Sequence, residues 1–158
     1  NNKLENYEFK NIVMELKTIS PIFENVLSNL TEMKEIAKFL TTKPQCFILG
    51  KNIGYPIAKE AALKLKEIGY IHAEAYPAGS LKHGPFSLIV KDYPIILLIL
   101  DDQYKDYMLN TLEEVKSRYA TTIIITNCEV IEKSELIDYI IKIPKSRPNC
   151  LDHATWTG

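Results

Sequence analysis

Hydrophobic positions along the chain follow two patterns, one typical of helices and one typical of buried strands. Between residues 5 and 40, apolar side chains recur every three or four positions, as they do on one face of a helix. These positions are Phe23, Val26, Leu27, Leu30, Met33, Ile36, Ala37 and Leu40. Ser20 and Pro21 suit the start of a helix, with Ser20 as N-cap. The pattern predicts a helical lead-in over residues 1–44 that packs on the following domain.

After this lead-in, short apolar runs alternate with amphipathic stretches. The pattern predicts strands at 46–49, 71–75, 94–100, 121–126 and 139–143, and helices at 55–68, 105–118 and 131–136. The inward positions of the helix at 105–118 are predicted to be Tyr107, Met108, Leu112 and Val115. Strands that alternate with helices indicate βαβ units. Residues 45–144 are therefore expected to form an α/β domain with three layers (α/β/α) and a mostly parallel sheet.

The helix predicted at 55–68 carries two different stripes. Ile57, Ala61, Leu65 and Ile68 are predicted to face the sheet, and Gly69 to cap the C-terminal end. Glu60, Lys64 and Glu67, at positions i, i+4 and i+7, line a neighbouring stripe. Two carboxylates and an amine within two turns can exchange protons with a ligand. The alternative is a solvated ladder of ion pairs, which is common on helices, and spacing alone leaves both open.

A second candidate for chemistry is His83, in the loop from Gly79 to Pro85. Flanking Gly and Pro residues give the loop an unusual backbone that can present the imidazole to a cleft, where it gives and takes protons near neutral pH. An exposed loop histidine without a task is the alternative. His72 lies in an apolar run and is interpreted as structural, and His153 carries no signal. No two His or Cys residues have the spacing of a zinc site.

Composition narrows the class of protein. Nineteen basic and twenty acidic residues give a net charge of −1, so no basic excess indicates a nucleic-acid partner. The longest apolar run is far shorter than the roughly 20 residues that span a membrane. Cys46 and Cys128 are expected to be buried, reduced thiols, which favours the cytoplasm. The apolar periodicity ends at Pro144, so residues 145–158 are predicted to be a loosely ordered tail.

The segment Tyr55–Ile68, continuing through Tyr70–Tyr76 to Leu81-Lys82-His83-Gly84-Pro85, resembles the glutamine–fructose-6-phosphate aminotransferase family. The match covers about thirty residues without a gap, which is more specific than a short motif. A looser resemblance extends from about Tyr7 to Pro144. The family joins an N-terminal glutaminase to two sugar-isomerase (SIS) lobes of flavodoxin-like fold. This chain is similar to the second lobe.

The resemblance implies the conversion of fructose 6-phosphate to glucosamine 6-phosphate with ammonia released from glutamine. It implies that Glu67 is the base that moves a proton between C1 and C2 of the sugar. Lys64 matches an acid–base lysine, Glu60 a supporting carboxylate, and Lys82 a supporting residue beside His83. His83 matches the histidine that helps to open the sugar ring and that enters the site from the partner subunit. A homodimer is therefore implied.

The resemblance also sets expectations about partners. The partners are a phosphosugar, the first SIS lobe and the glutaminase domain of the parent protein, and no cofactor or metal is expected. The phosphate-binding loop belongs to the first lobe, and Lys145 lies in no motif that would make it the family's imine-forming lysine. The chain alone is therefore expected to lack synthase activity. Two alternatives are a free-standing regulatory module that binds a phosphosugar tightly, and a dimerisation lobe whose Glu67 and His83 are dispensable.

Overall fold

A computed structural model describes residues 6–28, 30–129, 131 and 135–145, which belong to two compact units. The first unit comprises residues 1–30 and 144–158 and contains helix α1 (Asn6–Ser28). Pro21 lies inside α1, so the predicted helix start at Ser20 is wrong. A proline within a helix removes one hydrogen bond and introduces strain. The helix nevertheless continues on both sides of Pro21, from Asn6 to Ser28.

The second unit, residues 31–143, is built on a five-stranded sheet. The strands are β1 (Gln45–Gly50), β2 (His72–Pro77), β3 (Pro94–Ile99), β4 (Thr121–Thr126) and β5 (Tyr139–Lys142). Their order is β2-β1-β3-β4-β5, and every neighbouring pair is parallel. Side chains of the central strands are buried on both faces, so their apolar runs show no alternation. The expected parallel sheet is confirmed.

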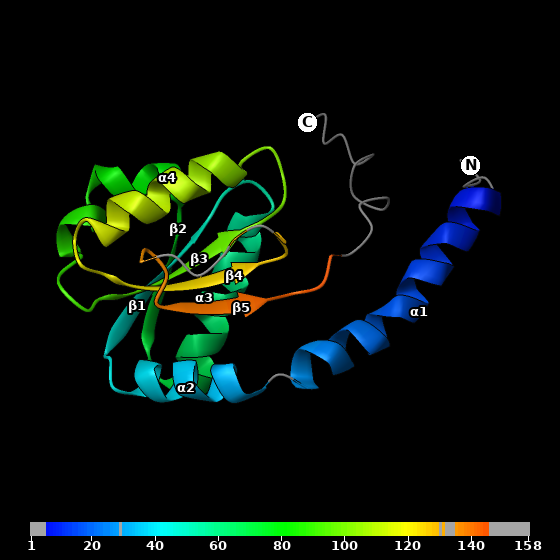
Figure 1. Cartoon of the computed structure of the whole chain (residues 1–158), viewed down its shortest axis with the longest axis horizontal. Helices are drawn as coiled ribbons and strands as arrows, with labels where there is room; N and C mark the ends of the chain where they lie inside the picture. Colours follow the sequence, from blue (N-terminus) through cyan, green and yellow to red (C-terminus); the bar gives the residue numbers. More distant parts are fainter. Residues whose placement is uncertain (1–5, 29, 130, 132–134, 146–158) are drawn as a thin grey trace. The chain divides into compact units, whose positions relative to one another are not determined.

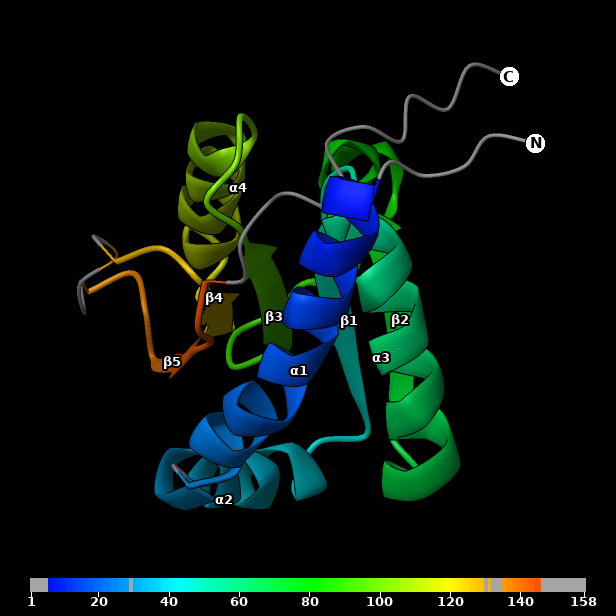
Figure 2. The ribbon, with the colours of Figure 1, turned by 90° about the vertical axis from the view of Figure 1, so that its right-hand side faces the viewer.

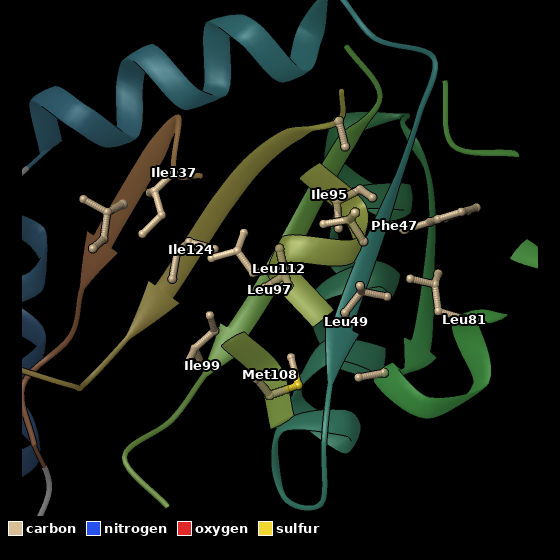
Figure 3. Packing of buried hydrophobic residues seen from close by; sticks show 14 of the residues in the cluster. Phe47, Leu49, Leu81, Ile95, Leu97, Ile99, Met108, Leu112, Ile124 and Ile137 are labelled. Carbon is tan, nitrogen blue, oxygen red and sulfur yellow. The ribbon is translucent and has the colours of Figure 1, made fainter. Parts of the chain in front are cut away.

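Helices cover both faces of this sheet, which confirms the three layers (Figures 1 and 2). Helices α2 (Leu30–Thr41) and α3 (Gly54–Gly69) contribute to the core on one face, and α4 (Lys105–Lys116) to the core on the other. Two short 3-10 helices, η1 (Ala78–His83) and η2 (Pro85–Leu88), follow β2. The core on the α4 side contains Phe47, Leu49, Leu81, Ile95, Leu97, Ile99, Met108, Leu112 and Val115, among others (Figure 3). Tyr107, which is predicted to point inward, is instead 42% exposed.

Helix α3 meets the sheet only partly through the residues predicted: Ala61 and Leu65 are partly buried and pack against the core, but Ile57 and Ile68 do not. Ala58 and Ala62 are buried, whereas Ile57 and Ile68 are 50% and 76% exposed. Small side chains let the helix approach the sheet closely, so the phase of the buried stripe follows the alanines rather than the larger isoleucines. The predicted cap at Gly69 is also wrong, because Tyr70 adopts the left-handed conformation (φ 52°) and donates its backbone N–H to the carbonyl of Leu65.

Several predictions fall wholly or partly outside the described residues. In the helix predicted at 131–136, residues 132–134 are not described, and Glu135 and Leu136 form a turn. The predicted tail beyond Lys145, with Cys150 and His153, also lies outside them. Cys46 and Cys128 are buried free thiols, as predicted, and burial raises the pKa of Cys46 to about 11. No helix among the described residues is long and apolar enough to cross a membrane.

A partly buried carboxylate ties α4 to the edge of the sheet. One oxygen of Asp138 accepts hydrogen bonds from Lys116 Nζ at 2.6 Å and from the backbone N–H of Thr122 at 2.8 Å. Burial works to raise the pKa of Asp138, but the hydrogen bonds from Lys116 and Thr122 outweigh it and hold the pKa below its usual value. The ionised form of Asp138 is therefore stabilised by folding.

We expect Asp138→Asn to lower the free energy of unfolding by about 1 kcal/mol at pH 7. This is less than the roughly 1.5–3 kcal/mol of a hydrogen bond to a charged group, because Asp138 is partly exposed to solvent. A carboxylate with a lowered pKa stabilises the fold above its unfolded pKa of about 3.9, and this contribution disappears as pH falls through the folded pKa. Denaturant melts from pH 7 to pH 3 should therefore converge for the wild type and Asp138→Asn. Asp92→Asn, at an exposed left-handed position that Asn tolerates, serves as the control. An equal effect of both substitutions at pH 7 would contradict this account.

Candidate functional site

The outward face of α3 brings together the three side chains that the sequence singled out on this helix. Lys64 Nζ lies 2.9 Å from Glu67 Oε2 and 3.5 Å from Glu60 Oε1. The helix orients them because residues three and four apart share a face. Ala58 and Ala62 face the sheet on the opposite side, so all three charged groups point into solvent in the isolated chain.

Lys64 is the cation of this cluster. Its hydrogen bond to Glu67 raises the pKa of Lys64 above the ordinary value, and the charges of Glu67 and Glu60 act in the same direction. The ammonium therefore stays protonated at neutral pH and can stabilise a negative charge that develops on a substrate oxygen. Each carboxylate can accept a proton. The cluster thus offers an acid and a base a few ångströms apart on a rigid helix.

Exposed apolar side chains lie close to this cluster on α3. Ile57 and Ile68 are largely exposed, and Ile53 just before the helix is exposed as well. On α3, helical spacing puts Ile57 and Ile68 on the flank next to the stripe of charged residues. Apolar side chains grouped around charged groups are typical of a surface that another protein part covers. The charged cluster therefore lies on a face suited to contact.

His83 ends η1, and the backbone next to it is unusual. Gly84 has φ 141°, a conformation that residues with a Cβ rarely adopt. Leu81, two residues before His83, is fully buried in the core on the α4 side (Figure 3). The imidazole of His83 is exposed and has no hydrogen-bond or ion-pair partner among the described residues. The segment is thus anchored at Leu81 and presents the imidazole outward.

Within one copy of the chain, Glu67 and His83 lie at opposite ends of β2. Helix α3 packs alongside β2 and ends just before it begins, so Glu67, in the last turn, lies near the start of the strand. His83 lies in η1, just after the strand ends. At about 3.3 Å per residue, the six residues of β2 span roughly 17 Å. One copy therefore does not bring these two side chains together.

His72 does not take the structural role that was predicted. It begins the edge strand β2, where its side chain is exposed and its Nε2 lies 3.4 Å from Glu74 Oε1. Ala73 takes the buried position, because side chains alternate along the strand. Glu74 also accepts a hydrogen bond from the hydroxyl group of Tyr76. This hydrogen bond, and to a smaller extent burial, raise the pKa of Tyr76 to about 12.

An open pocket of about 330 Å³ lies on another side of α3, facing β2. It is lined by Tyr55, Lys59, Ala62, Lys66, Glu74, Ala75 and Tyr76. None of Glu60, Lys64, Glu67 and His83 lines it. The candidate residues therefore lie outside this pocket, which agrees with their exposed positions.

The sequence of this chain matches the model of a known protein family. Residues 39–155 match the SIS domain. The chain belongs to the SIS domain family. The match starts within α2 and covers the whole sheet, so it includes both α3 and the segment that carries His83.

Curated relatives with this SIS domain are named as one enzyme. The chain is 39% identical over 140 residues to glutamine–fructose-6-phosphate aminotransferase (isomerizing) of Francisella tularensis, covering 89% of this chain and 23% of the relative. It is 43% identical over 107 residues to the enzyme named likewise in Legionella pneumophila, covering 68% of this chain and 18% of the relative. The chain thus spans about a quarter or less of the length of these relatives.

Solved structures agree with this SIS assignment. The C-terminal domain of glucosamine-fructose-6-phosphate aminotransferase from Francisella tularensis has a TM-score of 0.81 and 35% identity, over 92% of this chain and 41% of that one. Tagatose-6-phosphate ketose/aldose isomerase from Escherichia coli has a TM-score of 0.62 and 16% identity, over 83% of this chain and 39% of that one. The second likeness concerns the fold alone.

The SIS domain also contains contacts that sequence reasoning missed. Lys51 Nζ, in the turn after β1, lies 5.0 Å from the ring centre of Tyr107 and 5.7 Å from that of Tyr104. These residues lie where the strand order reverses between β1 and β3, a common ligand position in such sheets. Lys82, next to His83, pairs with Glu114 of α4 at 2.6 Å. No periodicity or motif marks these partners, because they come from separate elements.

Proposed function

We propose that the whole protein containing this SIS domain is an isomerising aminotransferase that forms glucosamine 6-phosphate from fructose 6-phosphate and glutamine. The observation that carries this proposal is the similarity to glutamine–fructose-6-phosphate aminotransferases, which extends over 89% of the chain in one relative. The grouping of Glu60, Lys64 and Glu67 on one exposed helix face supports it. A cytoplasmic location is part of the proposal and is supported by the free thiols of Cys46 and Cys128.

In this proposal, Glu67 is the base of the isomerisation. Ammonia replaces the oxygen at C2 of the open-chain sugar to give an imine, with loss of water. Glu67 then takes a proton from C1 and returns it to C2, while the imine nitrogen gains a proton and the hydroxyl group at C1 loses one, which converts the 2-imine into the 2-amino aldose. Lys64 donates to the adjacent oxygen atoms, and Glu60 holds the Lys64 ammonium from the other side. Such proton transfers contribute roughly 10²–10⁴-fold to rates.

His83 acts in this proposal on the site of a second copy. Its place beyond the far end of β2, a strand roughly 17 Å long, supports a shared site over a site within one copy. An imidazole can move a proton between the ring oxygen and the anomeric hydroxyl and so open the sugar ring. The exposed Ile57 and Ile68 beside the charged cluster support a covered face. A homodimer is therefore proposed.

Activity assays on two forms of the protein test this function. The whole protein, supplied with fructose 6-phosphate and glutamine, is expected to form glucosamine 6-phosphate. The 158-residue chain, supplied with fructose 6-phosphate and ammonia, is expected to show no turnover, because the first lobe and its phosphate-binding loop are needed. A whole protein that binds phosphosugars without converting them would contradict the proposal and favour a regulatory module. Sustained turnover by the chain alone would contradict the incompleteness of its site.

A further inference from the structure

The segment that carries His83 rests on one stripe of α4. Tyr107, Glu114 and Arg118 contact it in turn along α4 and the turn that follows. At the first contact, Gly79 lies against the hydroxyl group of Tyr107, so that a Cβ added to Gly79 would be 3.0 Å from Tyr107 Oη. At the second, Lys82 Nζ lies 2.6 Å from Glu114 Oε1. At the third, the Arg118 guanidinium lies 5.3 Å from the ring centre of Phe86.

The spacing of Tyr107 and Glu114 places them on the same face of α4. They are seven positions apart, an interval that aligns side chains along a helix, and Arg118 follows in the turn after the helix. A neighbouring face of α4 carries Met108, Leu112 and Val115, which are buried in the core. Helix α4 is therefore fixed against the sheet and offers the segment a rigid support.

Burial fixes the ends of the segment but leaves its centre exposed. Ala78, Leu81 and Ile89 are buried in the core on the α4 side (Figure 3 shows Leu81). Between Leu81 and Ile89, His83 and Gly84 are exposed, and the open space around Gly84 offers no packing. The side chain of Lys82 is therefore the nearest link between the backbone of His83 and a rigid element.

We propose that Glu114 is a positioning residue for His83, which it holds in place through its ion pair with Lys82. The inference rests on the proposed role of His83. Lys82 and Glu114 are 63% and 36% exposed, and ion pairs this exposed contribute little to the stability of a fold. Their effect is expected on geometry instead, since misplacement of a reacting group by about 1 Å can lower a rate a hundredfold. Glu114 itself contacts no substrate.

Kinetics of the whole protein test this inference. Glu114→Gln is expected to lower kcat about tenfold while KM changes little, because substrate binding does not depend on His83. Lys82→Glu should act in the same way. The double variant with Lys82→Glu and Glu114→Lys restores the ion pair in reverse, and we expect it to recover most of kcat. Glu113→Gln, at the adjacent exposed position, is the matched control and should match the wild type.

Hydrogen exchange supplies a readout that does not depend on activity. The peptide that covers residues 82–84 should exchange about threefold faster or more in Glu114→Gln than in Glu113→Gln, and the swapped pair should restore protection. Equal exchange in both variants, or a double variant that is no better than the single ones in kcat and exchange, would overturn this inference. A wild-type protein that forms no glucosamine 6-phosphate contradicts the proposed function instead. The two failures are thus distinguishable.

Discussion

Replacing Glu67 with Gln in the whole protein is expected to lower kcat for glucosamine 6-phosphate formation by about 10³-fold, within the usual 10²–10⁴-fold range for a general base. The amide has nearly the same shape as the carboxylate but cannot accept the proton from C1. Substrate binding should change little, because the ion pair between Lys64 and Glu60 remains. The loss is therefore expected in kcat rather than in KM.

Two further variants separate this chemical loss from a general loss of charge on α3. Glu60→Gln removes a carboxylate that lies 3.5 Å from Lys64 Nζ, and it is expected to cost about tenfold in kcat because it only supports the ammonium. Glu35→Gln, at an exposed position of α2, should have no effect. Glutamine hydrolysis should persist in all three variants, which would show that the protein is folded. A Glu67→Gln variant with wild-type kcat would remove Glu67 from the mechanism.

Gly50→Ala is expected to destabilise the SIS domain by about 3 kcal/mol or more, close to the upper end for overpacking. Gly50 ends β1, and a Cβ added there would lie 2.7 Å from the backbone nitrogen of Tyr55 and closer still to the carbonyl group of Gly54. These are backbone atoms at the start of α3, so no rotamer change can relieve the clash. The turn that launches α3, and with it the Glu67 face, would have to move.

Gly69→Ala provides the matched control for this substitution. Gly69 ends the same helix, its φ is not positive, and the nearest atom to an added Cβ is 3.6 Å away. Alanine is favoured over glycine in helices by about 0.5–1 kcal/mol, so stability should be unchanged or slightly raised. Urea denaturation of the 158-residue chain gives both free energies of unfolding. Equal stability of the two variants would show that the turn after β1 accommodates a side chain.

The fold could largely be predicted because local patterns determine it. Apolar runs such as 94–100 mark buried strands, and their alternation with amphipathic helices implies parallel neighbours. The phase of α3 could be predicted only in part, since Ala61 and Leu65 pack against the core as expected but Ile57 and Ile68 do not. Periodicity favours its large apolar residues, such as Ile57, as the buried stripe. The sheet instead takes Ala58 and Ala62, since close packing of helix on sheet depends on small residues.

The exposure of the isoleucines could not be predicted from the pattern either. A sequence pattern shows that Ile57 and Ile68 are apolar, but not that the folded chain leaves them exposed. By contrast, the pattern put Glu60, Lys64 and Glu67 on one stripe correctly, because helical spacing alone sets it. The pairing of Lys82 with Glu114 joins residues distant in sequence, so only the folded arrangement reveals it.

The central claim is that each site takes Glu67 from one copy and His83 from another, and a mixed dimer tests it most directly. One subunit carries Glu67→Gln and the other His83→Asn, with different affinity tags, so that sequential purification isolates the heterodimer. Each parental homodimer should be nearly inactive. In the heterodimer, one of the two sites would combine an intact Glu67 with an intact His83, because a two-fold interface pairs each residue with its counterpart in the partner.

We predict that this heterodimer regains about half of the wild-type kcat per dimer, one intact site of two. If Glu67 and His83 instead served the same site from the same copy, both sites of the heterodimer would carry a substitution. A heterodimer as inactive as its parents would therefore contradict the shared site.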